Sequence, residues 1–178
     1  MRSAQSIVAI LFGTIVSVGQ AQAQCSGNAG TCNTTNTASV TVGALVKLGM
    51  SATTTSLTAP TADQVDLGAL IADAGPTFTI KSNRSWTMNI RSGNATNWTY
   101  VGSNAGVKPI SDLTWSNAVA GTYAAITATD ALFTSGASAS NGTAGAAFFK
   151  TNYTAGFTNA ANAPGTYSLP IVFTLTAP

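Results

Sequence analysis

The C-terminal stretch from Pro164 to Pro178 constrains the fold more than any other part of the chain. Apolar side chains occupy every second position there: Tyr167, Leu169, Ile171, Phe173 and Leu175. In an extended backbone, alternate side chains point to the same face of a sheet, so this pattern predicts a β-strand with one face toward a core. Pro170 cannot donate a hydrogen bond to a neighbouring strand, which favours an edge position or a bulge.

A second alternating segment lies near the other end of the chain. Its apolar positions are Val40, Val42, Ala44, Val46, Leu48 and Met50. This segment predicts a first strand laid against a core. Its length matches that of the C-terminal strand, which would permit the two to lie side by side.

Further short strands are expected between these two segments, over residues 65–71, 77–92, 98–101, 113–115, 121–127, 131–134 and 146–153. A polar break at residues 81–84 makes residues 77–92 either a tight hairpin or one long strand with a bulge. Residues 135–145 lack large side chains and are predicted to form a surface loop. Short strands separated by Gly, Pro, Asn and Ser predict an all-β protein with an antiparallel immunoglobulin-like β-sandwich, a barrel being the alternative.

The N-terminus has the pattern of a secretion signal. Arg2 provides a positive charge, residues 7–18 are apolar, and Ala21 and Ala23 are small residues before a cleavage site after residue 23. The apolar run is too short to predict a transmembrane span. We therefore expect a signal peptide at 1–23, a polar segment at 24–39, a β-sandwich domain at 40–178, and a secreted product, in the periplasm or at the cell surface if the source is bacterial.

The chain contains two cysteines, Cys25 and Cys32. Because an exported segment enters an oxidising compartment, we expect a local disulfide between them. A redox pair would need a closer spacing, and a metal site would need further ligands.

Composition argues against catalysis and against nucleic-acid binding. The chain has no His, its five acidic residues are all Asp, and its formal net charge is only +2. General acid–base chemistry would lack its usual side chains, and there is no electrostatic case for nucleic acid or, after signal cleavage, for a membrane. Asp63, Asp66 and Asp73 do not have the spacing of a calcium loop. We expect no enzyme activity, no catalytic residues, no metal and no cofactor.

Aromatic residues are the remaining candidates for a binding site. Trp98, Trp115 and Tyr100 fall near expected turns and could stack on a sugar if they are exposed. Trp86 is in register with Met88 and Ile90 and is predicted to lie in the core. A carbohydrate-binding module for a surface polysaccharide is therefore the alternative function.

The closing pattern, Gly165 and Tyr167 followed by alternating apolar residues through Leu175, resembles that of bacterial fimbrial pilins of the spore coat protein U type. The export signal, the composition and the alternating strand near the mature N-terminus are also similar. The resemblance implies an incomplete immunoglobulin-like sandwich, completed by a strand from the next subunit. The donor face would be Val40, Val42, Ala44, Val46 and Leu48.

The leading hypothesis is thus a secreted, non-enzymatic structural or cell-surface protein, with a pilus-like subunit as its specific form. An apolar first strand must either complete its own sandwich or complete that of a like subunit. The short polar segment before Val40 favours self-completion and a monomer.

Overall fold

The computed structural model describes residues 30–178. The predicted signal peptide and Cys25 lie outside the described residues, so the signal and the Cys25–Cys32 disulfide stay predictions. The described chain is mostly β, and the paired strands are antiparallel. This part of the fold prediction is confirmed.

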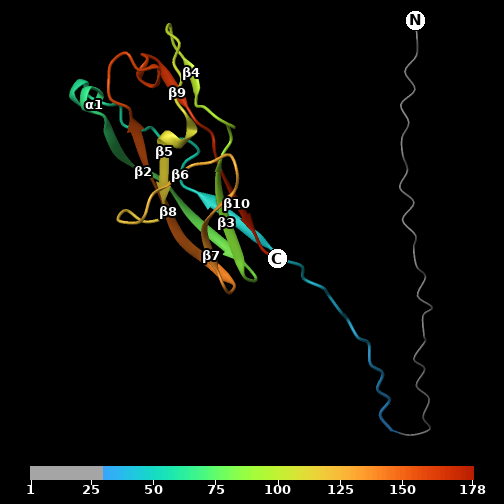
Figure 1. Ribbon diagram of the computed structural model, residues 1–178. Coiled ribbons are helices and arrows are strands. Elements are labelled where there is room, and N and C mark those ends of the chain that lie inside the picture. The colour runs from blue at the N-terminus through green and yellow to red at the C-terminus, as the bar shows by residue number, and fades with distance from the viewer. Residues whose placement is uncertain (1–29) are drawn as a thin grey trace, which may run out of the picture. The chain divides into compact units, whose positions relative to one another are not determined.

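Two larger sheets and one small sheet make up the β domain (Figure 1). The five-stranded sheet has the order β1 (Val46–Met50), β2 (Ala69–Ser82), β8 (Ser140–Tyr153), β5 (Leu113–Ser116) and β6 (Ala124–Ala125). The three-stranded sheet has the order β10 (Ile171–Thr176), β3 (Trp86–Ser92) and β7 (Ala131–Gly136). The small sheet pairs β4 (Thr99–Val101) with β9 (Thr166–Ser168). The helical turns are α1 (Ala62–Leu67), η1 (Ile110–Asp112) and η2 (Ala160–Asn162).

One hydrophobic core joins the two larger sheets. Phe78 on β2 packs against Phe133 on β7 and Phe173 on β10, with ring centroids 5.6 and 4.6 Å apart. Trp86, Met88 and Ile90 on β3 are buried, as their spacing predicts. Alternate side chains of strands from both sheets therefore face one interior, which fits a β-sandwich.

The connection after β2 is neither of the two predicted forms. β2 pairs with β1 and β8, whereas β3 pairs with β7 and β10. Residues 83–85 are therefore a crossing between sheets, not the tip of a hairpin or a bulge within one strand. The Asn83 side chain stabilises this crossing, because its Oδ1 accepts from the Leu45 amide at 2.9 Å and its Nδ2 donates to the Gly43 carbonyl at 2.9 Å.

Two other local predictions are wrong. Residues 62–67 form α1 rather than the start of a strand, because Thr61 and Gln64 make a capping box around the first turn. β8 already begins at Ser140, inside the predicted loop, because residues 140–146 pair with β2 despite their small side chains. The pairing between β2 and β8 therefore extends further than the sequence predicts.

The first strand is shorter than predicted. β1 covers Val46–Met50 and pairs with β2, not with β10. Residues 30–45 form no strand, and Val40 and Val42 are 87% and 67% exposed. The compact unit that contains the β domain is Val42–Pro178.

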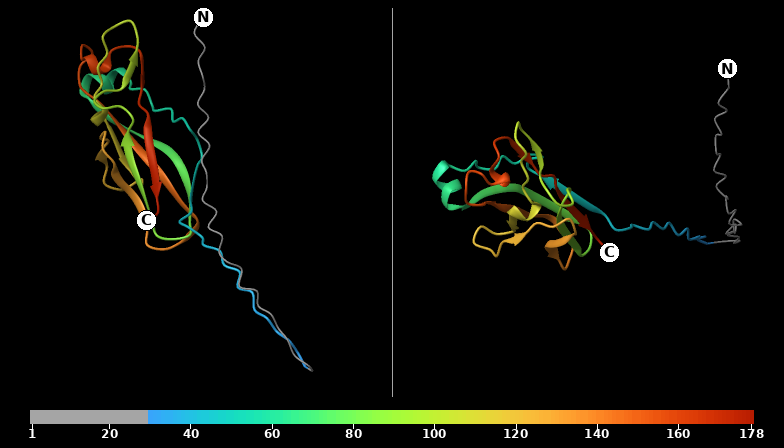
Figure 2. Two further views of the ribbon diagram at one scale, coloured as in Figure 1. Left: turned by 90° about the vertical axis from the view of Figure 1, so that its right-hand side faces the viewer. Right: turned by 45° about the horizontal axis from the view of Figure 1, so that its top comes forward.

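Different elements lie at the two ends of the β domain. The β4–β9 pair and α1 lie at one end, and the C-terminal end of β10 lies at the other (Figures 1 and 2). Pro170 falls in the break between β9 and β10, and its carbonyl accepts from the Gly93 amide at 2.8 Å. β10 has one strand partner and is an edge strand of its sheet, as Pro170 predicts.

Candidate functional site

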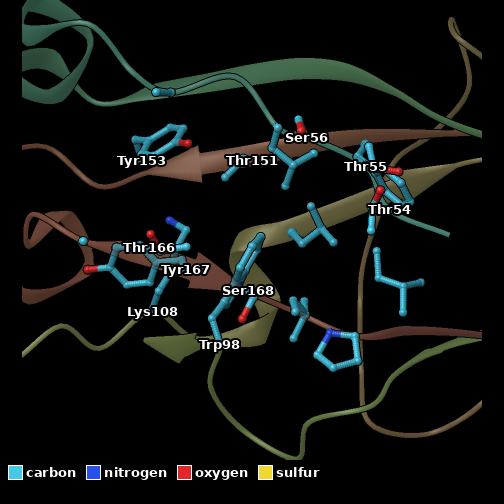
Figure 3. Close-up of a pocket in the computed structure, with 18 of the residues that line it drawn as sticks. Thr54, Thr55, Ser56, Trp98, Lys108, Thr151, Tyr153, Thr166, Tyr167 and Ser168 are labelled. Carbon is cyan, nitrogen blue, oxygen red and sulfur yellow. The ribbon is translucent and has the colours of Figure 1, made fainter. Parts of the chain in front are cut away.

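An open groove of about 890 Å³ runs between the two larger sheets. One wall is the segment that follows β1, from Met50 to Pro60, and the other is the chain from Thr166 to Phe173. Trp98, Lys108, Tyr153 and Tyr167 lie toward one end of the groove in Figure 3, and Thr54 and Thr55 toward the other.

Core side chains form the bottom of this groove. Trp98, Leu113 and Phe149 line it, although each is less than a tenth exposed. Thr151 also lines it, and its buried Oγ1 has no hydrogen-bond partner. Buried hydroxyls normally have a hydrogen-bond partner. At least one buried polar atom beside the groove therefore has no hydrogen bond from the described chain.

The two walls belong to the unpaired edges of the two sheets. β1 is the last strand of the five-stranded sheet, and β10 is the last strand of the three-stranded sheet. After β1 the chain stays near β2: the Ser51 amide donates to the Thr77 carbonyl at 2.9 Å, and the Thr58 hydroxyl donates to Asp73 at 2.6 Å. The groove is therefore a seam along which neither sheet has a further strand.

β10 is only half-buried along this seam. Leu169, Ile171, Phe173 and Leu175 all pack against the core cluster, yet each remains partly exposed. The sequence predicts that these residues face a core, and the structure confirms it. Their incomplete burial leaves an apolar strip beside an edge whose backbone groups lack a strand partner.

Aromatic residues close one end of the groove. The rings of Tyr100 and Tyr167 are 4.9 Å apart, and their hydroxyls donate to the carbonyls of Pro164 and Ala163 at 2.8 and 3.0 Å. The Tyr153 hydroxyl donates to the Thr58 carbonyl at 3.0 Å. Burial raises the pKa of Tyr153, and the nearby Asp73 carboxylate raises it further.

A buried ion pair lies near the same end. Lys108 Nζ is 3.0 Å from Asp112 Oδ2, and the two residues are 2% and 7% exposed. The Lys108 ammonium also lies 4.7 Å from the centre of the Tyr153 ring. The sequence analysis did not single out this pair, although Lys108 and Asp112 lie four positions apart in the sequence.

The predicted stacking platforms are not on the surface. Trp98 and Trp115 are both 8% exposed and belong to the hydrophobic core. Trp98 Nε1 donates to the Pro109 carbonyl at 3.1 Å, and Trp115 packs against Phe133. Tyr100 is half-buried against Tyr167. Trp98 and Trp115 are therefore not the exposed rings that stacking on a sugar would require.

The predicted donor face is divided by the structure. Val46 and Leu48 pair with Ser82 and Ile80 of β2, so they belong to the chain's own sheet. Val40, Val42 and Ala44 lie outside any strand and are exposed. A donor segment that leaves β1 intact must therefore lie before Leu45.

The remaining chemistry of the described residues is sparse. Within residues 30–178, no group of three acidic, His or Cys side chains could hold a metal ion. Asp73, one of the three aspartates considered for calcium, is engaged by Thr58. Among the described helices, none has the length and apolar character to cross a membrane.

Comparisons with known proteins found no matching family model, no matching curated protein and no matching solved structure.

Proposed function

We propose that this protein is a secreted, non-enzymatic structural subunit that polymerises by strand addition. Its β domain is an immunoglobulin-like sandwich that lacks one edge strand, and the exposed segment before β1 supplies that strand to another copy. The observation that carries the proposal is the open groove beside β10, whose bottom consists of core residues.

The chemistry of the groove suits an extended apolar segment. Its walls offer an unpaired strand edge on β10 and partly exposed apolar side chains at alternate positions. Strand addition uses main-chain hydrogen bonds for affinity and side-chain pockets for register. A strand paired with β10 would extend the three-stranded sheet and cover Phe173 and Ile171.

The occupant we favour is the segment before Leu45 of a second copy. Ala38, Val40, Val42 and Ala44 lie at alternate positions and are exposed. At about 3.3 Å per residue, the seven residues 38–44 span roughly 20 Å as a strand. Burying Val40 and Val42 would contribute about 1.5–3 kcal/mol each.

The structure changes the preference between a monomer and a polymer. The sequence favours self-completion, because the segment before Val40 is short, polar and expected to contain a disulfide loop. β1 instead starts at Val46, is paired with β2, and leaves the groove open. These observations support donation to another copy.

Light scattering coupled to size-exclusion chromatography on residues 24–178 tests the proposal. We expect a series of oligomers that differ by whole subunits, and a monomer when Val40 and Val42 are both replaced by Asp. Val119→Asp is the matched control, since Val119 is 68% exposed and lies outside this segment. A wild-type chain that remains a monomer at every concentration would contradict the proposal, as would a Val40→Asp/Val42→Asp chain that polymerises like the control.

A further inference from the structure

Lys108, Asp112 and Asn152 bring an amine, a carboxylate and a carboxamide together at the edge of the core. Lys108 Nζ donates to Asp112 Oδ2 at 3.0 Å, and Asn152 Nδ2 donates to Asp112 Oδ1 at 3.5 Å. Lys108 Nζ also donates to the backbone carbonyl of Asn152 at 2.5 Å. One carboxylate thus bridges the amine and the carboxamide, and the amine already contacts the residue that carries the carboxamide.

The surroundings are unusual for a lysine. Lys108 and Asp112 are the buried charged residues in the described part of the chain. The Tyr153 ring lies over the amine, and the Trp98 amide and indole bond to the carbonyls of Lys108 and Pro109 at 2.8 and 3.1 Å. A buried ion pair of this kind gains little net stability, because desolvation of both ions offsets their attraction.

We propose that Lys108 and Asn152 form an intramolecular isopeptide bond, with Asp112 as the catalytic residue. Asp112 first accepts a proton from the Lys108 ammonium, which frees the lone pair on Nζ. Nζ then attacks Cγ of Asn152. The new Nζ–Cγ bond forms, the Cγ–Nδ2 bond breaks, and a second proton from Nζ passes to Nδ2, which leaves as ammonia.

The atoms and charges balance without an outside reactant. The ammonium, the carboxylate and the carboxamide become a secondary amide, a protonated Asp112 and one ammonia molecule. No ion remains in the buried site, so the desolvation penalty of the pair is removed. Asn152 is itself exposed, which gives ammonia a way out. The reaction occurs once per chain and is consistent with a chain that turns over no external substrate.

The bond would join the segment before η1 to the end of β8. Both elements adjoin the groove, yet the cross-link does not depend on polymerisation. A monomeric chain could carry it, and a polymerising chain could lack it. An experiment can therefore contradict the cross-link without contradicting polymerisation, and the reverse is also true.

Intact-mass spectrometry of the purified mature chain is the test. We expect a mass lower than the sequence mass by one ammonia, in addition to any change from the cysteines and to the ammonia lost when an N-terminal Gln24 cyclises. Trypsin does not cleave before Pro109, so Lys108 stays in fragment 92–150 and Asn152 falls in fragment 151–178. The expected digest contains these two fragments joined, as a species with two N-termini.

Variants separate the cross-link from other losses of ammonia. Lys108→Arg keeps the charge but removes the nucleophile, and the full sequence mass should return. Asn152→Asp changes the leaving group, and the loss should change from ammonia to water. Lys150→Arg is the matched control and should keep the ammonia loss.

Three results would overturn the proposal. The first is a folded wild-type chain with the full sequence mass. The second is an ammonia loss that survives Lys108→Arg and lies within fragment 92–150 or 151–178, which indicates succinimide formation at an asparagine instead of a cross-link. The third is a digest in which fragments 92–150 and 151–178 separate. If a variant fails to fold, the wild-type mass and digest decide alone.

Discussion

The rings of Phe78 and Phe173 lie 4.6 Å apart, between β2 of one sheet and β10 of the other. Phe173 also contacts Phe133 edge-on at 5.6 Å. This contact joins the two sheets at the seam where the groove opens. It makes the C-terminal strand part of the core even though that strand is only half-buried.

Truncation of Phe173 should therefore destabilise the domain. Replacing a fully buried Phe by Ala costs about 3–5 kcal/mol, and the partial exposure of Phe173 reduces the expected loss to roughly 2–3 kcal/mol. Phe157→Ala is the control, because Phe157 is 63% exposed. Urea unfolding of both variants measures the difference, and equal midpoints would show that β10 does not stabilise the core.

Gly75 lies on β2 where a Cβ atom has no room. A Cβ built there would be 2.5 Å from Cε2 of Phe149 and 2.9 Å from the Ala147 carbonyl oxygen. Phe149 is buried and cannot move freely. Gly75→Ala should cost about 1–3 kcal/mol of unfolding free energy through overpacking.

Gly145 provides the control for this prediction. It lies on β8, and a Cβ there would meet nothing within 4 Å. Gly145→Ala should leave the unfolding midpoint nearly unchanged. Equal losses of unfolding free energy in the two variants would show that the close approach of Phe149 and Ala147 is not what excludes a side chain at Gly75.

Alternation of apolar residues predicted the strongest strands. The last strand, the burial of Trp86 and the edge position implied by Pro170 follow from spacing and from the missing amide of proline. The sheet assignment of β2 and β3 could not be predicted, because it depends on which strands pair across long separations. The same is true of β8, whose first half pairs with β2 through its backbone while its side chains are small.

At the candidate site, too, some features follow from the sequence and others depend on tertiary contacts. Val40 and Val42 were predicted as part of an apolar strand, and their alternation is a property of the sequence. Their exposure depends on where β1 begins, which Asn83 influences from a distant part of the chain. Trp98 and Trp115 have neighbours that look like turns, so their burial could not be inferred from local pattern. The meeting of Lys108 with Asn152 is a tertiary contact that the sequence does not signal.

Asn83 should hold the start of β1 against the crossing between sheets. Asn83→Ala removes its two side-chain hydrogen bonds to Gly43 and Leu45. Because both bonds are exposed, the global loss should stay near 1 kcal/mol, while hydrogen exchange at the Leu45 amide accelerates. Asn104→Ala, in an exposed loop, should change neither quantity. Unchanged exchange at Leu45 would show that β1 is held without Asn83.

Tyr153 should ionise at a higher pH than an ordinary tyrosine. Burial and the Asp73 carboxylate both raise its pKa above the usual value of about 10. Because the folded chain then holds the phenol proton more tightly than the unfolded chain, stability should fall as pH rises from the ordinary pKa to the raised one. The difference between ultraviolet titrations of the wild type and Tyr153→Phe gives the midpoint. A midpoint at or below that of free tyrosine would contradict this assignment.

The central claim is that the segment before β1 fills the groove of another copy. The most direct measurement places a photo-crosslinking amino acid at Val42 in unlabelled chains, which are mixed with ¹⁵N-labelled chains and refolded together. Mass spectrometry of the linked peptides should show position 42 of a light chain joined to residues 166–173 of a heavy chain. Links confined to one isotope, or no links to the groove, would contradict donation between subunits.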